Sequence, residues 1–88
     1  MIISLDYDET YTEDPDLFDC FIKKAKQNGH TIIIVTARSN DMPITDIKDV
    51  EVFYTNGLPK AEHMGNTHLQ PHVWIDDSPH LIGRYSFD

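Results

Sequence analysis

Residues 1–10 read Met-Ile-Ile-Ser-Leu-Asp-Tyr-Asp-Glu-Thr, a short apolar run that ends abruptly in acidic residues. The first five residues are apolar and partly β-branched, which is typical of a short buried strand. Asp6 and Asp8 follow at once, and residues two apart on an extended chain point to the same side. We therefore predict that residues 1–5 form the first, central strand of a sheet, with two carboxylates facing one space beyond its end.

The rest of the chain alternates between helical and strand patterns. Asp14 and Pro15 predict the cap and first position of a helix that ends at Asn28-Gly29. Apolar residues at helical spacing give this helix one buried stripe, made of Phe18, Phe21, Ile22 and Ala25. Further strands are predicted over residues 31–35, over 50–54 at a half-exposed edge and over 72–75, with a short helical turn over 41–48 and a weak helix over 59–69.

This alternation predicts an α/β fold, a Rossmann-like three-layer sandwich around a small parallel sheet of four strands in the order 4-1-2-3. Residues 85–87 could add a fifth strand beside the fourth. The connections after Thr10 and after the first helix are short, so we expect a single domain over residues 1–88 without a cap domain.

The composition narrows the classes of function. Seven Lys and Arg against 15 Asp and Glu give a net charge of -8, which argues against a broad nucleic-acid-binding surface and against an anionic membrane as partner. No apolar run is long enough to span a bilayer, and residues 1–5 lack the basic flank of a signal peptide. The single cysteine, Cys20, favours a reducing, cytoplasmic location.

Polar residues follow all four predicted strands. Ligands of open α/β sheets bind beyond the carboxyl ends of the strands, so these residues are expected to share one rim. They are Asp6, Asp8 and Thr10 after the first strand, Thr36 and Arg38 after the second, Lys60 after the third, and Asp76 and Asp77 after the fourth. Carboxylates gathered in this way repel each other unless a cation neutralises them, and Mg²⁺ prefers such oxygen ligands while still binding phosphate. We therefore expect a magnesium site that binds a phosphoryl group, with Lys60 as further positive charge.

In this order the motifs resemble the haloacid dehalogenase superfamily of phosphotransferases. The resemblance extends from residue 1 to about residue 79 and combines D-x-D-x-T at residues 6–10 with the apolar run that ends in Asp76-Asp77. It implies an Mg²⁺-dependent phosphomonoester hydrolase in which Asp6 is the nucleophile that forms an aspartyl-phosphate. Asp8 would be the general acid and then the base, Thr36 would bind a phosphoryl oxygen, and Lys60 would stabilise the nucleophile and the phosphate.

The same resemblance implies the binding residues. The expected metal ligands are Asp6, Asp8 through its backbone carbonyl, Asp76 and Asp77, of which Asp77 is favoured over Asp76 as the direct ligand because residues 74–79 are similar to a motif of capless phosphatases. The expected substrate-binding residues are Thr10, Thr36, Arg38 and Lys60. Without a cap the site would be open, which suits a macromolecular or nucleotide phosphate, or a homo-oligomer that closes the site.

Two other functions remain open from the sequence. A receiver domain of two-component signalling combines an acidic pair, a phosphorylated Asp, a Thr and a Lys, although in a different order along the chain. A non-catalytic binding module with this fold is the other alternative. Arg38 also has two interpretations, since it could bind a substrate phosphate or base, or form a salt bridge with Asp41.

Overall fold

A four-stranded sheet forms the centre of the protein. The computed structural model describes residues 1–83. Along the chain the elements are β1 (Ile2–Leu5), the 3₁₀ turn η1 (Tyr11–Glu13), α1 (Pro15–Gln27), β2 (Thr31–Thr36), β3 (Glu51–Tyr54), α2 (Lys60–Met64), β4 (Val73–Ile75) and the 3₁₀ turn η2 (Pro79–Leu81). The alternating strands and helices therefore form an α/β fold, as the sequence predicted.

All strand pairs are parallel, and the strand order is 3-2-1-4. The sequence predicted the order as 4-1-2-3, which names the same neighbours from the opposite edge of the sheet. β1 lies between β2 and β4, with Ile3 opposite Ile32 on one side and Val73 on the other. β3 is the edge strand next to β2, and its residues are partly exposed, as the alternation in its sequence predicted. The prediction of β1 as a central strand is confirmed.

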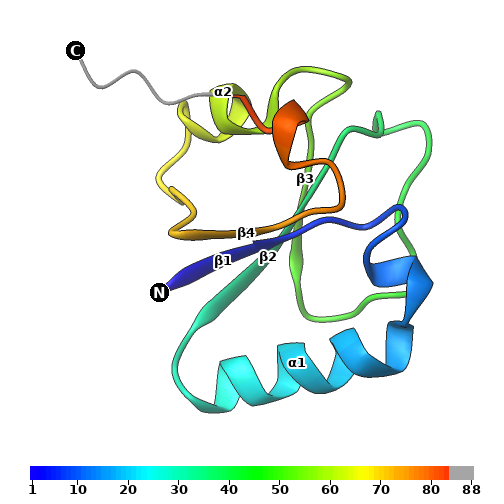
Figure 1. Ribbon diagram of the computed structural model, residues 1–88, viewed down its shortest axis with the longest axis vertical. Helices are drawn as coiled ribbons and strands as arrows, with labels where there is room; N and C mark the ends of the chain where they lie inside the picture. The colour runs from blue at the N-terminus through cyan, green and yellow to red at the C-terminus, as the bar shows by residue number, and fades with distance from the viewer. Residues whose placement is uncertain (84–88) are drawn as a thin grey trace.

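The two faces of the sheet are covered by different helices (Figure 1). On one face the buried residues Ile3, Leu5, Ile32 and Ile34 pack against Ile22 and Ala25 of α1. On the other face, Ile33 and Val35 pack against Met64 of α2. Since both faces of β2 are buried, its sequence is a continuous apolar run rather than an alternating one.

The first helix begins and ends as the sequence predicted. The Asp14 carboxylate accepts a hydrogen bond from the Leu17 backbone N–H at 3.2 Å, and Pro15 occupies the first helical position. At the other end Gly29 has φ of 85°, a conformation that suits glycine after a helix. These two signals set the ends of α1, which contains 13 residues. None of the described helices is long and apolar enough to cross a membrane.

The helical turn predicted for residues 41–48 is wrong, because this segment is an irregular loop. Its backbone groups bond to distant side chains instead of to each other, since the Ile44 N–H donates to the Tyr54 hydroxyl at 3.0 Å. The apolar side chains of Ile44 and Ile47 pack against the core on the α1 side. The segment predicted as a helical turn is therefore a loop whose apolar side chains pack against the core.

The helix predicted for residues 59–69 is much shorter, since α2 contains only residues 60–64. Gly65 follows directly, and the Thr67 hydroxyl donates to the Met64 carbonyl at 2.8 Å, which caps the last turn. The fifth strand predicted for residues 85–87 lies outside the described residues.

Candidate functional site

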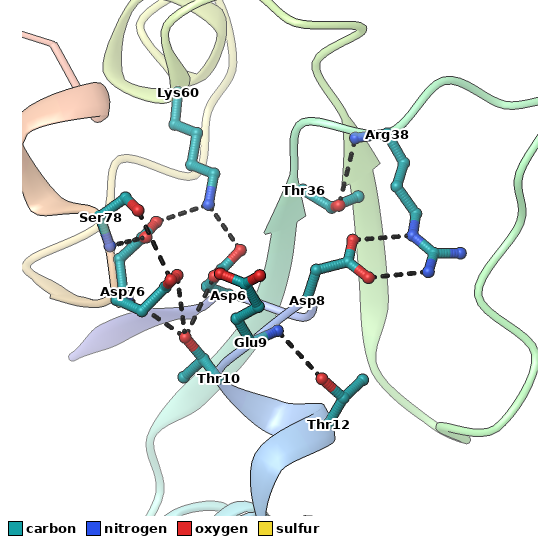
Figure 2. A network of polar contacts seen from close by, with 11 residues as sticks. Asp6, Asp8, Glu9, Thr10, Thr12, Thr36, Arg38, Lys60, Asp76 and Ser78 are labelled. Atoms are coloured by element: carbon teal, nitrogen blue, oxygen red, sulfur yellow. Dashed lines mark hydrogen bonds and ion pairs between the residues drawn. The ribbon is translucent and has the colours of Figure 1, made fainter.

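A pocket of about 320 Å³ opens where the carboxyl ends of the strands meet the start of α2. Its polar lining residues come from four separate segments and include Asp6, Thr36, Lys60, Asp76 and Asp77. Figure 2 shows several of these side chains pointing toward one another from β1, β4 and α2. The structure thus brings six of the eight residues that the sequence predicted at one rim into the lining of this pocket, whereas Thr10 and Arg38 are not among its described lining residues.

Three carboxylates form the floor of this pocket. Oxygen atoms of Asp6, Asp76 and Asp77 all lie within 4.8 Å of one another. The backbone fixes this arrangement, since the Asp6 N–H donates to the Ile75 carbonyl at 2.9 Å and so continues the ladder between β1 and β4. Parallel pairing of these two strands therefore brings residues from opposite ends of the chain into one acidic cluster.

A single ammonium group lies against two of these carboxylates. Lys60 Nζ is 2.8 Å from Asp6 Oδ1 and 2.5 Å from Asp76 Oδ2, and these three side chains are at most 10% exposed. Lys60 reaches the cluster from the first residue of α2 (Figure 2). One lysine against three carboxylates, of which Asp6 and Asp76 are shielded from water and Asp77 is exposed, leaves negative charge unneutralised.

The Thr10 hydroxyl links Asp6 to Asp77. Its hydroxyl lies 3.1 Å from Asp6 Oδ2, to which it donates, and accepts a hydrogen bond from the Asp77 N–H at 3.2 Å. Thr10 is not among the described residues that line the pocket. Thr10 therefore orients Asp6 and the Asp77 backbone, while Thr36, which is buried and lines the pocket, has the better position to contact a substrate.

Asp8 turns away from the acidic cluster toward Arg38 (Figure 2). Arg38 Nε and Nη2 donate to the two Asp8 carboxylate oxygens, both at 2.8 Å. The Arg38 guanidinium also stacks over the Tyr7 ring at 5.0 Å, and the Tyr7 hydroxyl donates to Asp46. This bidentate pair lowers the pKa of Asp8, so its carboxylate is ionised at neutral pH.

The structure bears on two expectations for these residues. Arg38 forms its salt bridge with Asp8 and not with Asp41, the partner in one of its two interpretations. The Asp8 carboxylate was expected to face the same space as that of Asp6, but it lies outside the cluster of Asp6, Asp76 and Asp77, because Arg38 holds it. The metal role that the resemblance implies for Asp8 uses its backbone carbonyl and does not depend on this side chain.

Burial and a shared hydrogen bond shift the acids of the cluster in opposite directions. Burial raises the pKa of Asp6 to about 6, and the neighbouring Lys60 ammonium only partly offsets this effect. A proton held by Asp6 can be donated to the nearby Asp77 carboxylate, and this lowers the pKa of Asp77, the exposed member of the cluster. The buried acid thus holds a proton more tightly than an ordinary aspartate, as carboxylates do when too little positive charge is near.

The donor set fits a magnesium ion. Mg²⁺ binds one or two carboxylates and keeps several waters, and the cluster offers carboxylate oxygens beside an open pocket. The raised pKa of Asp6 indicates that the lysine alone does not fully stabilise its charge. A divalent cation held by Asp6, Asp76 or Asp77 would supply the missing positive charge.

Some residues at the site carried no sequence signal of their role. Tyr7 supports Arg38 through its ring, yet it stands between two acids with nothing in the sequence to relate it to residue 38. Glu9 lines the pocket and has φ of 62°, and Ser78 donates its N–H to Asp76 Oδ1 at 2.9 Å. Both belong to motifs that were recognised for their neighbouring aspartates.

The raised pKa of Asp6 predicts how the metal-free protein responds to pH. In the folded state Asp6 binds a proton up to about pH 6, while its ordinary value is 3.8, so its contribution to stability is full below 3.8 and is lost as the pH rises through 6. In EDTA, we expect the wild type to be about 1 kcal/mol more stable at pH 5 than at pH 7 from this group, or several degrees in Tm. Calorimetry of wild type and Asp6→Asn at both values checks this, since the variant should lose that part of the difference. An identical pH response of the two proteins would show that Lys60 offsets the burial of Asp6 completely.

No protein-family model, curated protein or solved structure matches this chain. The resemblance to the haloacid dehalogenase superfamily therefore rests on the motifs of the sequence itself. The chemistry of the pocket follows from the placement of its carboxylates and its lysine.

Proposed function

We propose that this protein is an Mg²⁺-dependent phosphomonoester hydrolase of haloacid dehalogenase type that acts through an aspartyl-phosphate on Asp6. The observation that carries the proposal is the meeting of Asp6, Asp76 and Asp77 with Lys60 in one pocket. Carboxylates, one lysine and a strand-end threonine are what phosphoryl transfer requires, because the reaction depends mainly on positioning and charge neutralisation.

In the first step a carboxylate oxygen of Asp6 attacks the phosphorus of the bound ester. The new O–P bond forms as the bond to the leaving-group oxygen breaks, and that oxygen takes a proton from Asp8, which must first separate from Arg38 and bind a proton. In the second step water attacks the phosphorus, its proton passes to Asp8, and the carboxylate of Asp6 leaves. Lys60, at 2.8 Å from Asp6 Oδ1, keeps the nucleophile in place and offsets charge on the transferring group.

Mg²⁺, when bound by the acidic cluster, would neutralise charge on the phosphoryl oxygens and hold the substrate in line with Asp6. Thr36 is buried at the end of β2 and lines the pocket, where its hydroxyl accepts the Arg38 N–H at 3.2 Å and still has a hydrogen to donate to a phosphoryl oxygen. The residues of the chain therefore supply both the binding and the orientation.

The overall architecture supports this proposal at a coarser level. Parallel strands with α1 and α2 on opposite faces agree with a Rossmann-like three-layer sandwich, whose ligands bind at the carboxyl ends of the strands. The pocket has no covering domain among residues 1–83, so a large substrate or a second subunit could exclude water from it. We place the protein in the cytoplasm because it has a single cysteine, which cannot form a disulfide within the chain.

A panel of phosphomonoesters with and without Mg²⁺ tests the function. We expect release of inorganic phosphate in Mg²⁺ and a fall of at least about 100-fold in excess EDTA, with recovery when Mg²⁺ is restored. Circular dichroism in both conditions is the control for folding. Phosphate release that is equal with and without EDTA would contradict the metal-dependent mechanism.

The pair between Asp8 and Arg38 favours one second candidate, a domain that accepts phosphate on Asp6 and hydrolyses it slowly. While Arg38 holds both oxygens of Asp8, this acid is a poor proton donor to a leaving alkoxide and is not free to take a proton from the water that would hydrolyse the aspartyl-phosphate. Incubation with acetyl phosphate separates the two functions, since a stable aspartyl-phosphate without turnover would favour the phospho-accepting domain and rapid release of phosphate would favour the hydrolase.

A further inference from the structure

One wall of the pocket is apolar. Leu58, Pro59 and Leu81 line it, and we call these three residues the apolar wall. Leu58 is 55% exposed and Leu81 is 64% exposed, although both are large aliphatic side chains. Exposed apolar side chains that gather at a pocket mark a surface that another apolar group covers.

Backbone hydrogen bonds hold Leu58 in place. After β2 and β3 the two loops continue to pair, since Thr55, Asn56 and Gly57 donate their N–H groups to the carbonyls of Thr36, Arg38 and Ala37. The Leu58 N–H then donates to the Thr55 carbonyl at 3.1 Å. Gly57 has φ of 82°, which only glycine adopts without strain, and this turn directs the chain into α2.

A second set of contacts fixes Leu81 beside it. The Ala61 N–H of α2 donates to the Ile82 carbonyl at 2.7 Å, and Gly83 lies against Pro59, so that a Cβ at residue 83 would come within 3.0 Å of Pro59 Cβ. η2 and the start of α2 are therefore joined, as their adjacent ribbons in Figure 1 indicate. The wall exists before a ligand arrives, which lowers the entropy cost of binding.

The acidic lining of the pocket disfavours anionic leaving groups. Asp8, Glu9 and Asp77 are among the lining residues, and the whole chain has a net charge of -8. Among the described lining residues positive charge comes from Lys60, which already contacts two carboxylates and lies where the phosphoryl group would bind. A leaving group with a second phosphate or a carboxylate would therefore meet acidic side chains and apolar carbon.

From these observations we infer that the preferred substrates are phosphomonoesters with an uncharged, apolar leaving group, such as an aromatic ring, that packs against Leu58 and Leu81. The inference rests on the proposed phosphatase function and specifies the substrate class of the same site. The volume of about 320 Å³ leaves room for a phosphoryl group and one such group.

Benzyl phosphate and glycerol 1-phosphate test this preference, because both release a primary alkoxide and differ mainly in the polarity of the leaving group. We expect kcat/KM for benzyl phosphate to exceed that for glycerol 1-phosphate by about 10-fold or more. Leu58→Ser and Leu81→Ser should each lower kcat/KM for benzyl phosphate several-fold and leave that for glycerol 1-phosphate nearly unchanged. Leu58→Met should restore the preference, and Leu17→Ser, at a residue of α1 that is equally exposed at 57%, should not alter it.

The possible results distinguish a failure of the inferred substrate class from a failure of the proposed phosphatase function. Equal kcat/KM for the two esters in the wild type would overturn the substrate class and leave the phosphatase intact, whereas hydrolysis of neither ester would remove both. Loss of activity on both esters together with a change from dimer to monomer in light scattering would assign the leucines to a subunit interface and overturn the inference. Phenyl phosphate and a short uncharged phosphotyrosine peptide with blocked ends, compared in the same assay, distinguish a small-molecule source of the ring from a polypeptide.

Discussion

Asp6→Asn is expected to lower the turnover of phosphomonoesters at least about 1,000-fold while the protein remains folded. Asparagine has nearly the same shape, and its carbonyl oxygen can still accept the hydrogen bond from Lys60 Nζ, which lies 2.8 Å from Asp6 Oδ1, while its amide nitrogen would face the Thr10 hydroxyl as a donor. It lacks the charged oxygen that attacks phosphorus. The loss should therefore appear in kcat, and substrate binding should change far less.

Three measurements make this result specific. Steady-state kinetics give kcat, and trapping with hydroxylamine followed by mass spectrometry locates the phosphorylated residue, which should be Asp6 in the wild type. Asp41→Asn is the matched control, because Asp41 is an exposed aspartate in the loop after β2. Wild-type activity of Asp6→Asn would exclude the covalent route and leave direct attack by water.

The strands of this fold could be predicted because each is a short run with one interpretation. β2 is apolar and β-branched throughout, and the acids that follow β1 and β4 mark where those strands end. The same approach gave a wrong prediction for residues 41–48, which form a loop and not a helical turn. Ile44 and Ile47 have helical spacing, but the hydroxyl of Tyr54 binds the Ile44 N–H, and nothing local in the sequence relates that hydroxyl to this loop.

One part of the candidate site could also be predicted from the sequence, and another part could not. The meeting of Asp6 with Asp76 follows from parallel pairing of β1 and β4, so a correct topology was enough to predict it. The pair between Asp8 and Arg38 depends on side-chain directions across two neighbouring loops, and Asp41 was an equally good partner by spacing alone. Topology can be read from periodicity, whereas the choice among several nearby charges requires coordinates.

The second large effect concerns Asp8, for which the leaving group decides the size of the loss. Asp8→Asn is expected to lower kcat about 1,000-fold for an alkyl phosphate such as benzyl phosphate, because an alkoxide cannot leave without a proton. For 4-nitrophenyl phosphate, whose phenolate leaves unprotonated, the loss in the first step should be less than about 10-fold. Steady-state rates on the two esters and a burst of nitrophenolate in stopped flow measure this difference. Similar losses in the first step on both esters would contradict a general-acid role for Asp8.

Arg38 provides the complementary test, since it holds both oxygens of the Asp8 carboxylate at 2.8 Å and keeps its pKa low. Asp8 can donate a proton to a leaving group only after this bidentate pair opens, so the pair opposes catalysis unless the arriving substrate displaces the guanidinium. Arg38→Met removes the charge and keeps a side chain that can lie on the Tyr7 ring. If the pair persists in the substrate complex and opens only for each proton transfer, this variant should raise the pKa of Asp8 and so move the basic limb of the kcat profile, on which the general acid loses its proton, to higher pH on alkyl esters. Asp8→Asn should abolish that shift in the double variant. An unchanged profile would mean that Arg38 leaves Asp8 before the chemical step and that its ordinary role is to bind substrate.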